Sequence, residues 1–297
     1  MSQPAAWTRP TFRWSFTPGE PTVFQLEGVP PVYFDGERAR TRNWLATKHA
    51  DGAMHEPNFS YVLARLFEVL DPDVYFDVGG YIGYFTVLPL AWTRPSTRIV
   101  TFEMNPGWAK QIFLNVQQNR HLATSRSLVI NAGITNEVRL ASESTFEGFK
   151  LRDDNNERST DSKAESAVID LLTLDYVCET MELRPNLIKM DIEGHEAPAL
   201  AGAHHMLSQV RPTILFELHA DSLLGRHGAT RASVLEVLES HEYALYEVPG
   251  NRWSDFSDAP PLTKIDGVNR DKVVAASNTG LVAIPNEQRS RIDSLVS

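Results

Sequence analysis

The residues best suited to chemistry lie in the segment VYFDVGGYIGYF, residues 74–85, where an apolar run leads into Asp77 and then into a glycine-rich turn. Gly79 and Gly83 allow backbone turns and a close approach of a ligand that a Cβ would block. A helix beginning near Gly83 would direct free backbone N–H groups toward that ligand. The DxGxxxG spacing differs from the dinucleotide fingerprint GxGxxG, in which the acid follows the glycines. An acid before the glycines suits a ligand with a positive group, such as an ammonium or a sulfonium.

Polar residues also follow the next two predicted strands. Glu103 comes 26 residues after Asp77, and a carboxylate there can accept both hydroxyls of a ribose. Asn131, beside the small Ala132, could border an adenine ring, or it could simply cap the end of its strand. Both interpretations of Asn131 stay open from the sequence.

The segments KMDIEGHE and FELH hold the candidate catalytic residues. Asp191 follows an apolar strand and should point into the ligand site. His195 is predicted as the general base, because the pKa of histidine lies near neutrality, and Asp191 and His219 are the substitutes. Glu193 and Glu217 are predicted to bind the substrate, and the alternative for Glu217 is a structural acid bonded to the backbone or to Lys189.

The same residues raise the question of a metal. Asp191, Glu193, Glu217 and His219 offer oxygen and imidazole ligands that could in principle bind a hard or borderline cation. No HxH, HExxH or CxxC spacing supports a dedicated site, so the sequence favours no metal. Lys189 is expected to lie buried beside an acid and to position Asp191 or Glu193.

Alternating strands and helices must position these residues. From residue 56 onward the apolar pattern predicts helices at 59–70, 108–119, 197–207 and 231–240 and strands at 74–77, 98–102, 127–131, 186–190 and 213–218. This alternation indicates a doubly wound parallel sheet, in which ligands bind at the carboxyl ends of the strands. Two further strands, 243–248 and 281–285, are expected to form a terminal antiparallel pair.

We predict two parts in the chain. Residues 1–55 are rich in proline and short aromatic runs and form a β- and turn-rich extension that could cap the substrate, while residues 56–297 form the main domain. Residues 141–166 are polar and form a surface insertion. An alternative membrane span at 74–92 is disfavoured because Asp77, glycines and Pro89 interrupt the apolar run.

The composition limits the classes of molecule that the protein is expected to bind. The 297 residues carry a net charge of −10, which argues against nucleic acid and against anionic membranes and favours a small-molecule substrate. The start of the chain, MSQPAAWTRP, lacks the regions of a signal peptide, so we expect a cytoplasmic protein. Cys178 is the only cysteine and is expected to be a small buried hydrophobe. A homodimer is left open.

Six blocks in order carry a resemblance to a known family: HEP (55–57), FDVGGYIGYFT (76–86), FEMNP (102–106), LTLDYV (172–177), LIKMDIEGHE (187–196) and ILFELH (214–219). With these blocks the chain resembles FkbM-type methyltransferases, a branch of the class I S-adenosylmethionine-dependent enzymes. The resemblance implies a Rossmann-like sheet of seven strands, mostly parallel, with Asp77, Gly79 and Gly83 in the cofactor loop and Glu103 on the ribose. Gly80 and Tyr81 stand where the family more often has Ala and Asn.

We therefore assign one set of residues to the S-adenosylmethionine site: Glu56, Asp77, Gly79, Gly80, Tyr81, Gly83, Glu103, Met104, Asn105, Asn131, Ala132 and Asp191. The predicted reaction is methylation of a hydroxyl of a small metabolite, such as a sugar or a polyketide, with S-adenosylhomocysteine as the other product. A carboxylate or an amine is the alternative acceptor. A nicotinamide-dependent oxidoreductase and a non-catalytic cofactor-binding scaffold are the rival classes.

Overall fold

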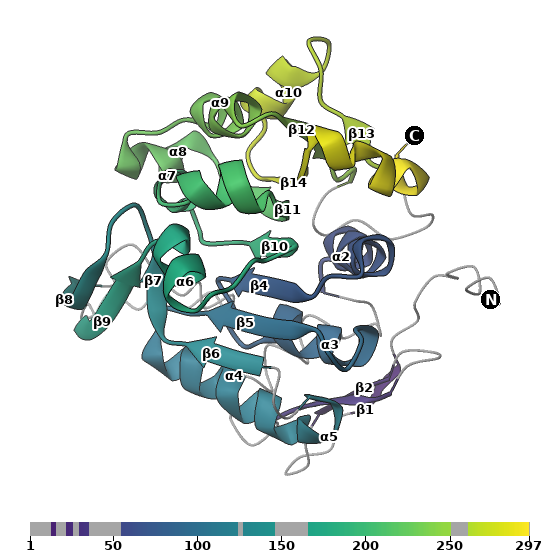
Figure 1. Ribbon diagram of the computed structural model, residues 1–297, viewed down its shortest axis with the longest axis vertical. Helices are drawn as coiled ribbons and strands as arrows, with labels where there is room; N and C mark the ends of the chain where they lie inside the picture. The colour runs from purple at the N-terminus through teal and green to yellow at the C-terminus, as the bar shows by residue number, and fades with distance from the viewer. Residues whose placement is uncertain are drawn as a thin grey trace, which may run out of the picture.

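A computed structural model describes residues 13–15, 22–25, 30–35, 55–123, 127–145, 166–250 and 261–296 of the chain. Its centre is a sheet of eight strands, which Figure 1 shows stacked from β13 at the top of the view to β6 near the bottom. In spatial order the strands are β13 (Thr263–Lys264), β12 (Tyr243–Glu247), β14 (Thr279–Pro285), β11 (Thr213–Leu218), β10 (Leu187–Met190), β4 (Val74–Val78), β5 (Arg98–Phe102) and β6 (Ser127–Ile130).

The pairing of the strands confirms the predicted doubly wound sheet. Strands β11, β10, β4, β5 and β6 run parallel, whereas β14 runs antiparallel to both β11 and β12. The sheet has one strand more than the seven expected. The additional strand is the edge strand β13, whose two residues are too few to give a periodic pattern in the sequence. The chain passes outward from β4 through β5 and β6 and then returns to β10, so β4 and β10 flank the point where strand order reverses, the usual ligand position in such sheets.

Helices cover both faces of the sheet (Figure 1). Side chains alternate along a strand, so that Tyr75 packs in one core and its neighbours Val74 and Phe76 pack in the other. The first core takes residues from α2 (Pro57–Leu70), α3 (Tyr84–Trp92), α4 (Pro106–Gln118) and η3 (Asn286–Leu295). The second takes residues from α6 (Leu174–Thr180), α7 (Glu196–Ala201), η1 (Met206–Val210), α8 (Asp221–Leu224), α9 (Arg231–Ser240) and α10 (Arg270–Ala275).

One predicted helix differs in detail from the structure, and the alternative of a membrane span is excluded. The segment predicted as one helix over 197–207 is α7, which ends at Ala201, and the separate π-helix η1. The apolar segment 74–92 is the strand β4, the glycine loop and the helix α3, which rules out the alternative of one continuous span. Among the described helices, none is both long and apolar enough to cross a membrane. Cys178 is buried in the second core, as expected, and burial raises the pKa of its thiol to about 12.

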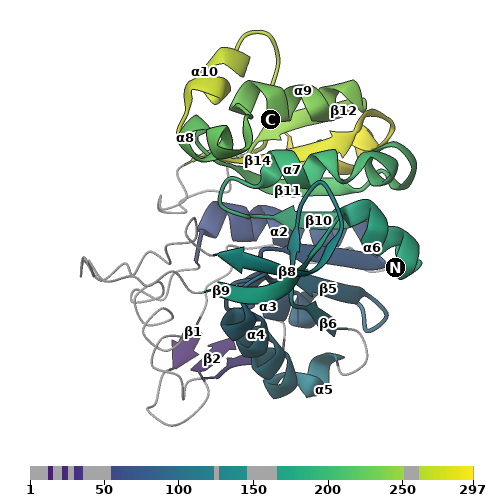
Figure 2. The same cartoon turned by 90° about the vertical axis from the view of Figure 1, so that its left-hand side faces the viewer.

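A second, three-stranded sheet contains both ends of the predicted insertion. Strand β7 (Ala132–Ile134) follows β6 directly after Asn131 and pairs with β9 (Ser166–Leu172), which pairs in turn with β8 (Arg139–Thr145). Because β7 continues beyond the carboxyl end of β6, this small sheet lies at the edge where ligands are expected, and Figure 2 shows β8 and β9 crossing in front of the large sheet. The rest of the insertion, residues 146–165, lies outside the described residues.

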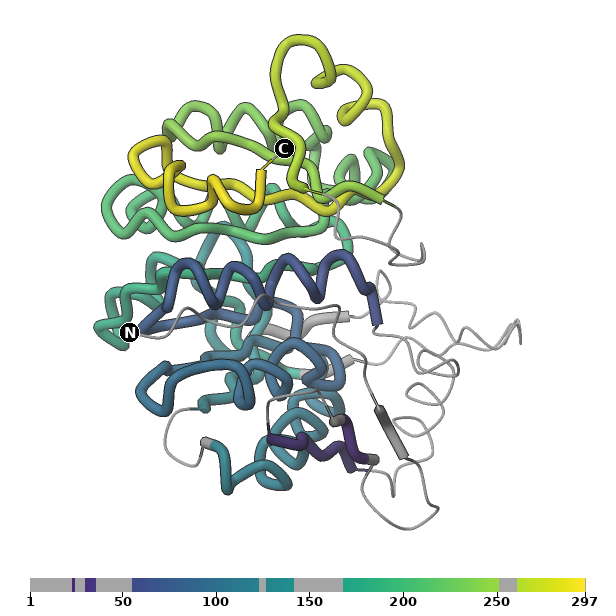
Figure 3. Tube along the Cα trace, turned by 90° about the vertical axis from the view of Figure 1, so that its right-hand side faces the viewer, coloured from purple at the N-terminus to yellow at the C-terminus, as the bar shows by residue number. Residues whose placement is uncertain are grey.

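The described strands of the N-terminal extension pack on the main domain. They are β1 (Arg13–Ser15), β2 (Thr22–Gln25) and β3 (Val32–Phe34), which form a three-stranded sheet. The purple parts of the tube in Figure 3 belong to β2 and β3. Phe24 and Phe34 are almost fully buried and contact the ring of Tyr84, at the start of α3. Asn119, at the end of α4, accepts a hydrogen bond from the Tyr33 N–H at 2.8 Å and donates one to the Tyr33 carbonyl at 2.6 Å. These contacts hold β3 against α3 and α4, while a capping role for residues 1–55 stays a prediction.

Candidate functional site

The glycine loop after β4 is pressed between the neighbouring strands. Gly79 has a φ of +85°, and a Cβ built on it would lie 1.9 Å from the Asp191 carbonyl oxygen. The N–H groups of Gly79 and Gly80 both donate to the Phe102 carbonyl, at 3.0 and 3.1 Å. Gly83 has a φ of +87° and precedes the first residue of α3, so the helix begins where the sequence predicts. The loop therefore requires glycine at position 79 for both conformation and space.

Gly80 and Tyr81, where the chain departs from the resembling family, fit their surroundings as a pair. A Cβ on Gly80 would lie 2.5 Å from the Thr101 Cγ2 and 2.7 Å from the Ile112 Cδ1, so even alanine would displace these side chains. Tyr81 adopts a φ of +50°, and its ring packs on Trp108 with centroids 4.4 Å apart. Trp108 is buried at this contact, so the tyrosine ring packs against the core of the domain.

Asp77 is fully buried and faces Lys189. The Lys189 Nζ lies 3.4 Å from the Asp77 Oδ1 and donates to the Gly79 carbonyl at 2.9 Å, while the other oxygen of Asp77 accepts from the Thr86 hydroxyl at 2.7 Å. Burial lowers the pKa of Lys189, but the charges of Asp77, Asp191 and Glu56 raise it above its ordinary value, so the ammonium keeps its proton. Lys189 is thus buried beside an acid, as predicted. The acid in its ion pair is Asp77, whereas the prediction named Asp191 or Glu193, and its ammonium also bonds the glycine loop.

Glu103 joins the loop after β4 to the turn after β5. Its two carboxylate oxygens accept from the backbone N–H groups of Tyr81 and Asn105, each at 2.8 Å. Burial raises the pKa of Glu103 to about 7, although these two hydrogen bonds and the charge of Lys189 lower it. Each carboxylate oxygen has a second lone pair, so a bidentate contact to two hydroxyls remains available.

The residues after Glu103 are held by Asn131. Its Nδ2 donates to the Glu103 carbonyl at 2.8 Å and to the Met104 carbonyl at 3.0 Å. A Cβ on Gly133 would lie 3.9 Å from the Met104 sulfur, so Met104 borders the small residues of β7, among them the buried Ala132. Asn131 therefore fixes the strand end, and its role beside an adenine stays a prediction.

Glu56 stands immediately before α2 in a left-handed conformation, with a φ of 47°. Its carboxylate is 3% exposed and lies 2.9 Å from the His55 Nε2. Its charge also helps to raise the pKa of Lys189, the residue that bonds the glycine loop. Its assignment to the cofactor site stays a prediction.

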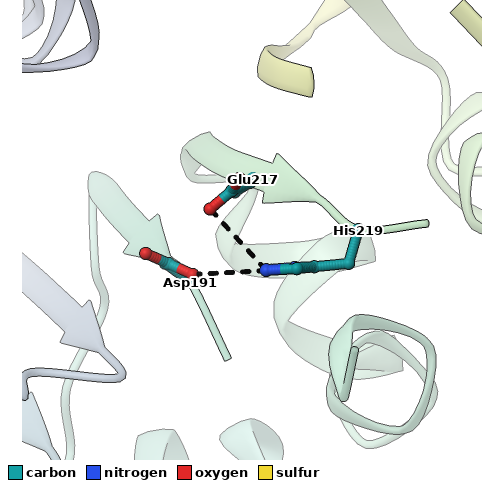
Figure 4. A group of neighbouring side chains, drawn as sticks. All are labelled: Asp191, Glu217 and His219. Carbon is teal, nitrogen blue, oxygen red and sulfur yellow. Dashed lines mark ion pairs between the residues drawn. The ribbon is translucent and has the colours of Figure 1, made fainter. Parts of the chain in front are cut away.

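Acids surround His219 at the carboxyl ends of β10 and β11. The His219 Nε2 lies 3.8 Å from the Asp191 Oδ1, 3.4 Å from the Glu193 Oε2 and 3.7 Å from the Glu217 Oε2. Figure 4 shows the carboxylates of Asp191 and Glu217 converging on this nitrogen. The structure thus brings together four of the residues predicted for catalysis and substrate binding.

Two residues that sequence reasoning gave no role hold this cluster in place. Glu196, in the first turn of α7, is fully buried, and its Oε1 lies 2.7 Å from the His219 Nδ1. Arg231 of α9 is 1% exposed and donates to the carbonyls of Leu218 and His219. An acid within a charged run and an arginine at a helix start give no local signal of burial, so the sequence could not single them out.

His195 has a different environment from His219. It precedes the first residue of α7, and its ring packs on the ring of His227, with centroids 4.1 Å apart. Burial and then the charges of His227 and Arg226 lower the pKa of His195 to about 4. Its imidazole is therefore neutral at pH 7 and can accept a proton, but it is a weaker base than the near-neutral histidine on which the sequence prediction relies. By contrast, burial lowers the pKa of His219, but the carboxylates of Glu193, Glu196 and Asp191 raise it further, to about 11.

Comparison with known proteins connects this site to a family. The family model described as the methyltransferase FkbM domain matches residues 77–245, more than half of the chain. The matched span contains the glycine loop, Glu103 and the acids around His219. No curated protein sequence matches the chain.

Solved structures show distant likenesses. A methyltransferase FkbM from Methylobacillus flagellatus KT is 19% identical with a TM-score of 0.44, over 72% of this chain and 44% of that one, so the chain spans less than half of its length. The O-methyltransferase from Bacillus cereus in complex with SAH is 11% identical with a TM-score of 0.46, over 84% and 92%. The O-methyltransferase TomG from Streptomyces achromogenes, in complex with SAM, is 11% identical with a TM-score of 0.42, over the same shares.

Proposed function

The chain belongs to the FkbM methyltransferase family, and on that premise we propose that it transfers the methyl group of S-adenosylmethionine to a hydroxyl oxygen of a small metabolite. S-adenosylhomocysteine would be the second product. Bound S-adenosylmethionine supplies an electrophilic methyl group on its sulfonium. The protein's part is to hold the acceptor oxygen in line with that methyl and to remove its proton.

The observation that carries the proposal is the meeting of the glycine loop with Glu103. Gly79 has no room for a side chain, and the N–H groups of Tyr81 and Asn105 hold the Glu103 carboxylate at the carboxyl end of β5. In this position Glu103 would accept the two ribose hydroxyls of the donor. The residues Met104, Asn131 and Ala132 would border the adenine, since they lie beside the turn that Glu103 begins.

The methionine end of the donor belongs to the loop between Asp77 and Gly83. Because Lys189 offsets the charge of Asp77, we assign Asp77 to holding the loop through Lys189, and Glu56 to the positive end of the donor. Backbone N–H groups at the start of α3 would face the donor carboxylate.

On the acceptor side we propose His195 as the general base. A neutral imidazole can take the proton of an alcohol as the methyl is transferred, and the lowered pKa of His195 keeps its ring unprotonated. Asp191 is the substitute for this role, whereas His219, predicted as a second substitute, is held protonated at pH 7 by a pKa of about 11 and cannot accept the proton. Glu193 and Glu217 would orient the acceptor through hydrogen bonds to its hydroxyls.

Calorimetry with S-adenosylmethionine, S-adenosylhomocysteine and NAD tests the donor. We expect saturable binding of the first two. Binding of NAD alone would instead favour an oxidoreductase, and binding of none of the three would favour a scaffold. A donor carrying an isotope-labelled methyl group, offered with alcohols, carboxylates and amines, then reports the acceptor class by mass spectrometry.

The variant His195→Ala separates the alcohol from the carboxylate as acceptor. With an alcohol, we expect turnover to fall by about two to four orders of magnitude while donor binding is kept. A carboxylate needs no base, so nearly intact turnover with this variant would refute the hydroxyl proposal. His204→Ala, which removes an exposed histidine, is the matched control.

A further inference from the structure

Three side chains at the ends of two adjacent strands offer one ligand atom each to a common point. Asp191 follows β10, and Glu217 and His219 stand at the end of the neighbouring strand β11 (Figure 4). Their ligand atoms all lie within 4.8 Å of one another. The set combines two carboxylates with one imidazole.

The spacing suits coordination better than hydrogen bonding. The His219 Nε2 is 3.8 Å from the Asp191 oxygen and 3.7 Å from the Glu217 oxygen, beyond hydrogen-bond length. Ligand atoms at about 2.1 Å from a metal ion are about 3.0 Å apart at right angles and about 4.2 Å apart when they are opposite. Both separations from Nε2 fall between these limits, and all three ligand atoms lie within 4.8 Å of one another, so an ion would need only small side-chain adjustments.

Glu196 orients the imidazole for this purpose. Its Oε1 lies 2.7 Å from the His219 Nδ1 and also accepts from the Gly194 N–H at 3.2 Å. This contact places a proton on Nδ1 and turns Nε2 toward the other carboxylates. A carboxylate that receives the far N–H of a metal-bound histidine is the common supporting partner of such ligands.

The nitrogen that this contact aims inward is buried. The His219 side chain is 1% exposed, and its Nε2 has no hydrogen-bond partner among the described residues. A buried polar atom in this state costs free energy unless a proton or another cation meets it.

The charge around this nitrogen is strongly negative. The carboxylates of Asp191, Glu193 and Glu217 lie within 4 Å of Nε2, and that of Glu196 contacts the other ring nitrogen. Of the cations in the described part of the chain near this cluster, Lys189 bonds the glycine loop and Arg231 bonds backbone carbonyls and Thr279. A divalent ion would offset the remaining charge.

We infer that Asp191, Glu217 and His219 bind one divalent transition-metal ion, with Glu196 as a positioning residue behind His219. A mixed oxygen and nitrogen donor set favours ions of the Mn²⁺ to Zn²⁺ series over Ca²⁺ and Mg²⁺, which prefer oxygen alone. The sequence does not favour a metal because these ligands follow no known spacing, and only the pairing of β10 with β11 brings them together.

The site lies next to the proposed donor loop, since the Asp191 carbonyl abuts Gly79. If the proposed methyl transfer is correct, an ion here would bind the acceptor oxygen and lower the pKa of its hydroxyl. This extension rests on the proposed function, whereas binding of the ion does not.

The test is titration of the full, chelator-treated chain with Mn²⁺ alone, without donor, by calorimetry and electron paramagnetic resonance. We expect one saturable ion per chain, with spin-echo modulation from one imidazole nitrogen. Asp191→Asn and Glu217→Gln should each weaken binding at least tenfold, and His219→Gln should abolish the nitrogen signal. Glu236→Gln, which changes an exposed acid on α9, should bind like the unmodified chain.

Three results would overturn the inference. They are no saturable binding at millimolar Mn²⁺, a signal without nitrogen coupling, and affinity equal to that of the unmodified chain in Asp191→Asn and Glu217→Gln. Glu193→Gln changes a side chain that is 59% exposed, so this variant should fold normally. It should change the affinity for Mn²⁺ less than Asp191→Asn or Glu217→Gln does. Because donor binding is measured separately, failure of the metal site leaves the donor result intact.

Discussion

The pKa of Glu103 makes donor binding depend on pH in a calculable way. In the empty protein burial raises the pKa of this carboxyl to about 7, while the proposed contact with two ribose hydroxyls requires the ionised form. A rise in pH from 6 to 8 increases the ionised fraction from about one tenth to about nine tenths. The affinity should therefore rise about tenfold over this range, about 1.4 kcal/mol, and level off above pH 8. Near pH 7 each binding event should release about half a proton.

Calorimetry of S-adenosylmethionine binding in buffers of different ionisation enthalpy measures both the affinity and the proton release. Glu103→Gln is the control, because it keeps every other titrating group, including those of the donor. We expect this variant to bind at least about tenfold more weakly at pH 8 and to lose the pH dependence. A flat affinity in the unmodified protein between pH 6 and 8, or an equal slope in the variant, would refute the assignment of Glu103 to the donor.

Three further changes test the structure around the loop. Gly79→Ala should lower the free energy of unfolding by about 3 kcal/mol or more, because the Cβ of the alanine would overlap the Asp191 carbonyl. Gly228→Ala is the control, since Gly228 also has a positive φ but has open space around it, and it should lower the free energy of unfolding by only about 1 kcal/mol. Chemical denaturation measures both. Lys189→Met should lower the free energy of unfolding by about 3–5 kcal/mol, because it leaves Asp77 buried without its cation. Adding Asp77→Asn should recover part of this loss, and simple additivity of the two changes would contradict the pairing. Asn119→Ala should cost about 2 kcal/mol and speed proteolysis within the first 35 residues, and unchanged proteolysis would show that β3 is held by other contacts.

The sequence predicts the sheet well because its signals are local. A buried strand such as Val74–Val78 is a short apolar run, and the glycines after it allow the turn that the structure shows at Gly79 and Gly83. The rule that ligands sit at carboxyl ends then locates Glu103 and the acids after β10 and β11. The two-residue strand β13 and the break of the predicted helix at Ala201 have no comparable local signal.

The pairing of side chains was harder to predict, because partners far apart in sequence meet only through the strand order. Lys189 lies only two residues from Asp191, yet the parallel register of β10 with β4 places it opposite Asp77. The same reasoning applies to Glu196, whose partner His219 is 23 residues away. The sequence indicates which residues are charged, and the register decides which of them neutralise one another.

The two buried charge clusters at this edge of the sheet differ in balance, and the difference bears on function. Asp77 has one cation, Lys189, at 3.4 Å, and the pair also holds the loop, so its cost of burial is offset within the fold. Around His219, three carboxylates lie within 4 Å of one ring nitrogen, an arrangement that self-repulsion would destabilise in the absence of an added cation or bound proton. Packing alone gives no reason to gather these acids. If they serve a ligand, then replacing Asp191 and Glu217 together by Asn and Gln should abolish Mn²⁺ binding while the metal-free chain still folds, and a metal-free double variant that does not fold would show that the acids hold the fold itself.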